Sequence, residues 1–109
     1  MPFDERLAER VRALLANRRD IREQKMFGGI GFLLRGNMCV GVWKEFLILR
    51  LGEERAKAAL AQQHTRPFDI TGKAMRGWVM VTKEGCKSAR GLSAWVQHAV
   101  SFVETLEPK

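Results

Sequence analysis

The chain has 109 residues and a formal net charge of +7, with 46% hydrophobic and 28% charged residues. This composition is that of a folded globular chain, and it excludes a disordered tail or a low-complexity sequence. No uncharged apolar run approaches the roughly 20 residues of a membrane span, and the charged N-terminus lacks the apolar stretch of a signal peptide. We therefore expect a single domain over residues 1–109, cytoplasmic and without membrane contact.

The N-terminal segment from Asp4 to about Asn17 has the periodicity of an amphipathic helix. Apolar residues recur at spacings of three and four, and charged residues occupy the opposite side. Asp4 suits the N-cap position because its carboxylate can accept hydrogen bonds from free backbone N–H groups of the first turn. Residues 18–24 follow as a charged connection.

The next three segments predict an antiparallel meander. A first strand runs from about Lys25 to Arg35, and a turn at Gly36-Asn37 leads to a second strand that ends at Trp43. Lys44-Glu45 is short enough for another hairpin turn, before a third strand over residues 46–51. These strands are apolar on both faces, so neither face can lie fully in water. We expect helices on one face, and further helix, a second subunit or a ligand on the other.

Alternation along each strand predicts which residues share a face. In the second strand it groups Met38 with Val40 and Val42, opposite Cys39 and Trp43. Glycines recur inside both strands of the first hairpin. Because glycine weakens a strand, this repetition indicates a bulge or the close approach of other groups.

The second half of the chain predicts two helices and a fourth strand. Residues 53–64 have acids in the first turn and form the first of these helices, and residues 65–76 form a loop. Residues 77–82 have the pattern of a strand, and the last helix begins within residues 88–93 and ends near Leu106.

The expected fold class is α+β. An antiparallel sheet of about four to five strands, a meander after an N-terminal helix, packs against the N- and C-terminal helices. We expect the three tryptophans, Trp43, Trp78 and Trp95, to pack the sheet against the C-terminal helix.

The sequence contains no pattern that predicts a cofactor or metal. Gly29-x-Gly31 lacks the third glycine and the following helix of a dinucleotide-binding motif, and no phosphate-binding GK[ST] occurs. His64 and His98 have no second ligand at metal-binding spacing, so we expect both on the surface.

The two cysteines and the acids give little support to an enzyme. Cys39 lies in a strand, where it is expected to pack as a small apolar residue, and Cys86 is expected to be an exposed thiol in a basic loop. A reactive Cys86 is the alternative. No acid pair stands out either, so we predict no catalytic residues.

Positive charge is concentrated in residues 65–91, which hold six bases against two acids. Basic side chains beside an aromatic residue suit phosphate contact and base stacking, and the Lys73–Trp78 loop has this pattern. A solvated face without a partner is the alternative. The candidate binding residues for nucleic acid or a partner are Arg66, Lys73, Arg76, Trp78, Lys83, Lys87 and Arg90.

Several motifs together resemble the TfoX/Sxy N-terminal domain family, in particular its short, stand-alone members. They are KMFGGIGFLLRGNMCVGV, LRLG, RPFDITGKAMRGWVMV and LSAWVQHAVSFVETLEPK, and they cover nearly the whole chain in the family's order. Lys73-Ala74 departs from the Arg-Pro of many short members. Besides Trp78, the signature positions, expected to be structural, are Met26, Phe27, Gly28, Gly29, Gly72, Met75 and Gly77.

The resemblance implies an α+β domain with no established catalytic residues and no cofactor. Longer members regulate natural competence in bacteria, together with the cyclic-AMP receptor protein at promoters. It therefore implies a non-enzymatic module that acts by protein–protein contact, for which the transcription machinery is the expected partner. Three alternatives stay open: nucleic-acid binding through residues 66–90, small-molecule binding beside the glycine-rich strand, and thiol chemistry. We also expect partial self-association as a homodimer.

Overall fold

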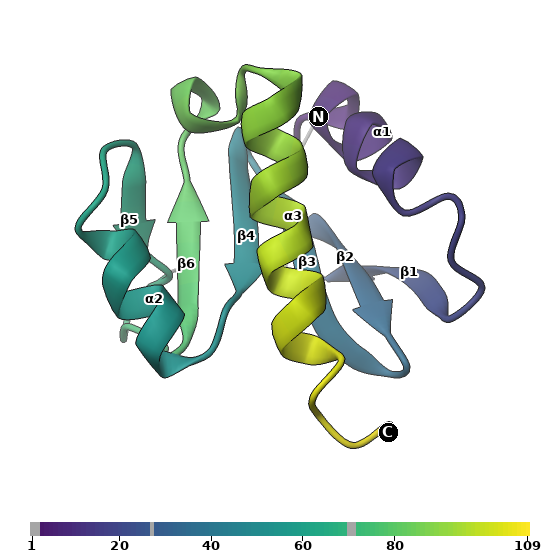
Figure 1. The fold of residues 1–109 in the computed structure, drawn as a ribbon. Coiled ribbons are helices and arrows are strands. Elements are labelled where there is room, and N and C mark those ends of the chain that lie inside the picture. The colour runs from purple at the N-terminus through teal and green to yellow at the C-terminus, as the bar shows by residue number, and fades with distance from the viewer. Residues whose placement is uncertain (1–2, 27, 70–71) are drawn as a thin grey trace.

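The computed structural model describes residues 3–26, 28–69 and 72–109, and within these ranges the chain folds into helices packed on a sheet (Figure 1). In chain order the elements are α1 (Glu5–Leu14), β1 (Ile21–Met26), β2 (Gly29–Leu34), β3 (Asn37–Trp43), β4 (Phe46–Arg50), α2 (Glu53–Leu60), β5 (Thr65–Pro67), β6 (Trp78–Val81), the 3₁₀ turn η1 (Lys83–Cys86) and α3 (Ala89–Val103).

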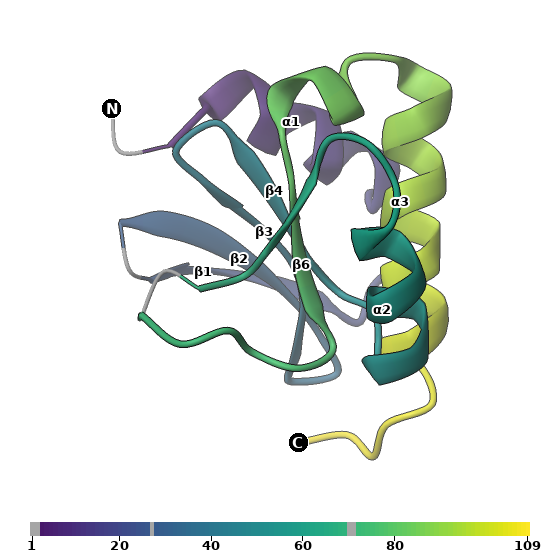
Figure 2. The ribbon, with the colours of Figure 1, turned by 90° about the vertical axis from the view of Figure 1, so that its left-hand side faces the viewer.

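The strands form one antiparallel sheet of six strands in the order β1-β2-β3-β4-β6-β5. The first four strands are a meander, while β6 returns beside β4 and carries β5 at the far edge. The three α-helices lie on one face of this sheet, and residues 68–69 and 72–77, between β5 and β6, lie on the other (Figure 2). The predicted α+β class is confirmed, with more strands than the four to five expected.

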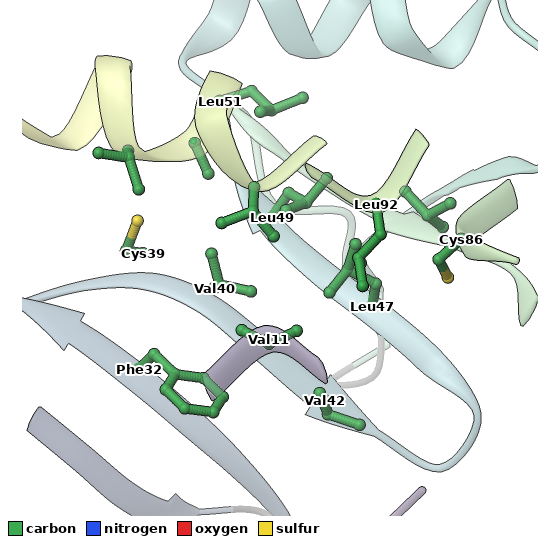
Figure 3. Packing of buried hydrophobic residues seen from close by; sticks show 14 of the residues in the cluster. Val11, Phe32, Cys39, Val40, Val42, Leu47, Leu49, Leu51, Cys86 and Leu92 are labelled. Atoms are coloured by element: carbon green, nitrogen blue, oxygen red, sulfur yellow. The ribbon is translucent and has the colours of Figure 1, made fainter. Parts of the chain in front are cut away.

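The core lies between the sheet and the helices (Figure 3). α3 crosses β3 and β4, and its apolar stripe is buried against them, as its periodicity predicts. Ser88 caps the start of α3, and Asp4 caps α1 by accepting a hydrogen bond from the Leu7 N–H at 3.0 Å. The inward-facing strand residues are Ile30, Phe32, Leu34, Val40, Val42, Leu47, Leu49, Val79 and Val81.

The predicted first strand is in fact two strands joined by a tight turn. Met26, the last residue of β1, pairs with Gly29, the first residue of β2, and Gly28 between them has φ 77°. Glycine adopts this left-handed conformation without the steric cost of a side chain. Residues 18–24, expected as a connection, therefore contribute most of β1. Its charged residues, typical of an edge strand, hid it from the sequence pattern.

The turn between β2 and β3 lies one residue earlier than predicted. Arg35 and Gly36 are its central residues, with φ 54° and 87°, as in a type I′ turn. Asn37 belongs instead to β3, where it pairs with Leu34 and is buried. Its side-chain nitrogen Nδ2 donates a hydrogen bond to the carbonyl of Glu107 at 2.8 Å, which fixes the C-terminal tail.

A bulge in β3 reverses part of the predicted face assignment. Phe32 pairs with Val40 while the next residue, Leu33, pairs with Met38, so Cys39 is an extra residue in the ladder. Cys39 is fully buried in the core on the helix side. Met38 lies on the opposite face, and the predicted grouping of Met38 with Val40 is wrong.

The segment predicted as a loop from Thr65 to Arg76 begins with a short strand. α2 ends at Leu60, and Thr65 Oγ1 then donates a hydrogen bond to the Ala59 carbonyl at 2.8 Å. Residues 65–67 pair with β6 as the edge of the sheet. A three-residue edge strand containing proline carries little sequence signal.

An ion pair joins α1 to the edge strand β1. Arg12 Nε lies 2.6 Å from Glu23 Oε2, and Arg12 Nη2 lies 2.8 Å from Glu23 Oε1, so the guanidinium contacts both carboxylate oxygens. The hydrogen bond from Arg12 holds the pKa of Glu23 below its ordinary value of 4.5. Because both side chains are partly exposed, solvent screens much of this attraction.

We predict that Glu23→Gln lowers the free energy of unfolding at neutral pH by at most about 1 kcal/mol. A carboxylate with a lowered native pKa stabilises the fold above its unfolded pKa, and this contribution is lost as the pH falls through the native pKa. The difference between wild type and variant should therefore shrink as the pH falls below 4.5. Urea unfolding across a pH series measures it, and a difference that stays constant down to pH values well below 4.5 contradicts the prediction.

Candidate functional site

The sheet face opposite the helices contains an apolar cleft with a volume of about 410 Å³. We call it the glycine-floored cleft. Its walls come from β1, β2 and β3, from β4, and from Phe68, Met75 and Trp78 beside the sheet. The lining residues share the absence of a titratable side chain, and they are Met26, Gly29, Ile30, Met38, Gly41, Val42, Trp43, Ile48, Phe68, Met75 and Trp78.

Gly29 and Gly41 line the floor of the cleft, and Gly31 lies beneath the side chain of Met38. Gly31 on β2 pairs with Gly41 on β3, so two adjacent positions on this face have no side chain. A Cβ built on either glycine would lie 2.7 Å from the side chain of Met38, from Sδ at Gly31 and from Cε at Gly41. The glycines therefore leave room for methionine side chains above the sheet, which is the close approach that their repetition predicts.

Two tryptophans form opposite walls of the cleft. Trp43, at the end of β3, stacks on Phe46 with ring centres 6.2 Å apart, and Trp78, at the start of β6, contacts Phe68 at 5.5 Å. The expected packing of these two tryptophans against the C-terminal helix is wrong, because their pairing register directs them to the other face. Trp95 alone packs against the helix-side core.

The segment between β5 and β6 is held to the sheet by backbone hydrogen bonds. The Met75 N–H donates to the Phe68 carbonyl at 3.0 Å, which closes the segment on itself. The Gly77 carbonyl accepts from the N–H groups of Leu51 at 2.8 Å and Gly52 at 3.1 Å. Met75 is thereby positioned as an outer wall, with 42% of its surface exposed.

Cations lie against the aromatic residues of this face. Lys44 Nζ is 4.6 Å from the centre of the Trp43 ring, and the guanidinium carbon of Arg50 is 5.4 Å from that of Trp78. Arg66 lies 5.8 Å from the Phe46 ring. Such cation–π contacts hold a positive charge over the ring. The interior of the cleft is therefore apolar, and Lys44 and Arg50 lie against the two tryptophans that line it.

The seven predicted binding residues do not form one surface. Arg66 and Trp78 share the cleft face of the sheet, because Arg66 pairs with Met80, which lies two residues after Trp78. The predicted Lys73–Trp78 loop precedes β6, and there Arg76 lies 3.8 Å from the carboxylate of Glu53. The other three bases follow β6 at its opposite end, around η1 and the start of α3 (Figure 1). They are Lys83, Lys87 and Arg90.

The signature positions fall into two groups. Gly28, Gly72 and Gly77 have positive φ values of 77°, 89° and 84°, so their role in the backbone explains the residue type. The others, expected to be structural, line the cleft together with Trp78: they are Met26, Gly29 and Met75. Phe27 lies outside the described residues.

Most residues that line the cleft were not predicted from the sequence. Met38, Trp43, Ile48 and Phe68 line it, although none was a candidate site residue. The repeated glycines were the available signal, since they indicated close approach to this hairpin. The sequence could not show that Met38 is the residue that lies over them, because the bulge at Cys39 turns Met38 onto this face.

Neither cysteine is an accessible nucleophile. Cys86 was predicted as an exposed thiol, but η1 turns it into the core, where its Sγ donates a hydrogen bond to the Thr82 carbonyl at 3.1 Å. Burial raises the pKa of Cys86 to about 11 and that of Cys39 to about 12. Since the thiolate is the reactive form, a nucleophilic role for Cys86 is unsupported.

The histidines belong to the surface, as expected. His98 Nδ1 lies 3.0 Å from Arg55 Nη1, in an exposed contact between α3 and α2. Among the described residues, no three His, Cys, Asp or Glu side chains gather in a way that could hold a metal ion. Within the same residues, no helix is long and apolar enough to span a membrane.

The sequence profile of the TfoX N-terminal domain matches residues 13–103 of the 109-residue chain. The chain belongs to the TfoX N-terminal domain family. Comparisons with curated proteins and with solved structures gave no match. The matched range includes all strands of the sheet and every residue that lines the glycine-floored cleft. The family resemblance of the sequence motifs is thus confirmed.

We predict that two neighbouring glycines of β2 respond differently to alanine. A Cβ on Gly29 would collide with the backbone carbonyl of Val42, which the strand pairing holds in place. A Cβ on Gly31 would meet only the flexible ends of Met26 and Met38. Gly29→Ala should therefore lower the free energy of unfolding by about 1–3 kcal/mol. Gly31→Ala, the matched control, should change it by less than about 1 kcal/mol.

Urea unfolding followed by circular dichroism measures both variants. Equal destabilisation by the two substitutions would show that the methionines above the floor are as rigid as the backbone, contrary to the prediction.

Proposed function

We propose that this protein is a non-enzymatic binding module of the TfoX N-terminal type. In this proposal it contacts a protein of the bacterial transcription machinery, in competence-type regulation. The observation that carries the proposal is the sheet face left free by the helices, with an apolar cleft and an exposed methionine wall. Contiguous apolar surface on a soluble protein is typical of an interaction site.

The residue types on this face are those of a protein interface. Tryptophan, methionine and arginine are enriched at the centres of interfaces, and here Trp43, Trp78, Met75 and Arg50 lie on or beside one cleft. A partner that covers this surface would remove exposed apolar area from water, which stabilises the complex.

The composition of the cleft supports binding rather than catalysis. General acid–base or nucleophilic catalysis requires a titratable or nucleophilic group within hydrogen-bond reach of the substrate. The residues that line the cleft are glycine, methionine, aliphatic and aromatic, and both thiols are buried in the helix-side core. An enzyme active site would need groups that this cleft does not supply.

We predict that Met75→Asp weakens partner binding about tenfold or more, because a charge buried in the interface would cost at least about 1.4 kcal/mol. Leu14→Asp on α1 is the matched control, since Leu14 is 41% exposed and Met75 is 42% exposed. The test uses biolayer interferometry with the purified chain, RNA polymerase and the cyclic-AMP receptor protein of the host bacterium.

The control should bind within about twofold of wild type. If neither protein binds the chain, or if the two variants lose affinity equally, the proposed contact through this face is wrong. Circular dichroism of both variants verifies that they are folded.

Direct nucleic-acid binding is the second candidate. The observation that favours it is a hollow in which Lys83 and Lys87 lie together with Arg6 and Arg10 of α1, beside the start of α3. Acids also line this hollow, which reduces its positive potential. They are Asp4, Glu45 and Glu84.

Basic residues lie at both ends of β6, so substitutions at one end can be compared with substitutions at the other. If the chain binds duplex DNA, log affinity should fall linearly with log salt, because phosphate contacts release counterions. We predict that Lys83→Ala/Lys87→Ala flattens this slope by about 2, and that Lys73→Ala/Arg76→Ala leaves it nearly unchanged. Fluorescence anisotropy across a salt series measures the slopes. Absence of binding at low salt removes the candidate.

A further inference from the structure

We propose that the glycine-floored cleft binds a small, flat, apolar molecule that carries one carboxylate. This site goes beyond the protein contact proposed above, and binding to it requires no partner protein. The inference rests on three properties of the cleft: its size, the shape and chemistry of its lining, and the position of its cations.

The size of the cleft suits a small molecule. Its volume of about 410 Å³ lies within the roughly 300–1,000 Å³ that is typical of ligand sites. The lining residues come from β1, β2, β3 and β4 and from Phe68, Met75 and Trp78, so an occupant would contact the protein on several sides. A bicyclic ring system is of the right order for this space.

The lining favours a flat, apolar body. The floor is formed by Gly29, Gly41 and the side chain of Met38, which lies over the paired glycines Gly31 and Gly41. Trp43 and Trp78 line the walls, each already in contact with a phenylalanine, and a further aromatic group can pack against such rings with offset or tilted geometry. Met26, Met38 and Met75 are flexible and polarizable, so they can adjust to a ring that enters between them.

The positions of the charged side chains around the cleft indicate that the ligand carries a negative charge. No lining residue of the cleft has a charged side chain, so a charged group of the ligand must lie at the rim. Arg50 does not line the cleft, but its guanidinium carbon lies 5.4 Å from the ring centre of Trp78, which does. A guanidinium can bind both oxygens of a carboxylate, and this pairing is stronger than a hydrogen bond between neutral groups. Lys44 beside Trp43 adds a second positive charge to the rim.

The test uses the full chain and two probes of the same size, 2-naphthoate and the neutral 2-naphthalenemethanol. Isothermal titration calorimetry should show saturable binding of one 2-naphthoate per chain. We expect roughly fivefold to tenfold weaker binding of the neutral probe, as the loss of a charge-assisted hydrogen bond at an exposed rim predicts. Arg50→Gln should abolish this preference. Arg19→Gln, which removes a charge from an exposed position on the connection between α1 and β1, should retain it.

Methionine methyl NMR locates the probe without any substitution. The signals of Met26, Met38 and Met75 should shift during the titration, because these side chains line the cleft. Binding that leaves these signals unchanged, or no binding at millimolar probe, overturns the proposed site. Equal affinities for the two probes in wild type overturn the carboxylate assignment. Because no partner protein is present, these outcomes are independent of the partner-binding test.

Discussion

The structure depends on a sheet that is apolar on both faces while the α-helices cover only one. On the helix side, inward residues of four strands pack with α1, α2 and α3 into a core from which water is excluded. The opposite face carries Trp43, Trp78, three methionines and the glycines that line the cleft. Apolar surface in water is unfavourable, so the chain between β5 and β6 folds back along this face and covers part of it. The cleft is the part that remains, bounded by that segment and by the first two hairpins.

Elements that depend on contacts between residues close in sequence were predictable, and elements that depend on pairing between distant segments were not. α1, α3 and the hairpin of β3 and β4 are specified by local periodicity and turn length, and the sequence predicted them within a few residues. β1 and β5 were missed, because charged residues in one and a proline in the other weaken the local strand pattern. Both are strands only by pairing with β2 and β6. The same holds for the bulge at Cys39, which depends on the register between two strands and exchanges the faces of Cys39 and Met38.

The candidate site shows the same limit. The loop before β6 was the first choice from sequence, and Met75 and Trp78 do line the cleft. The reason given for that choice, a basic loop for phosphate contact, is not the one that the geometry favours. Trp78 packs into an apolar wall, while the cation that lies over its ring is Arg50 from β4. Pairing of β4 with β6 brings Arg50 opposite Trp78, although the two residues are far apart in the sequence. No local pattern could predict that contact.

A protein on the outer surface and a small molecule in the cleft would meet the same two side chains. Met75 is both an exposed wall residue and a lining residue, and Trp78 lies between the cleft and the rim cation. An occupant that packs against these residues restricts their rotamers and those of the segment closed by the Met75–Phe68 hydrogen bond. A partner that needs the same arrangement then pays less conformational entropy on binding, whereas a partner that needs a different one binds more weakly. Thermodynamic linkage requires the effect to be equal in both directions, so the partner changes the affinity for the small molecule by the same factor. If both proposed contacts exist, they would thus be coupled through Met75 and Trp78.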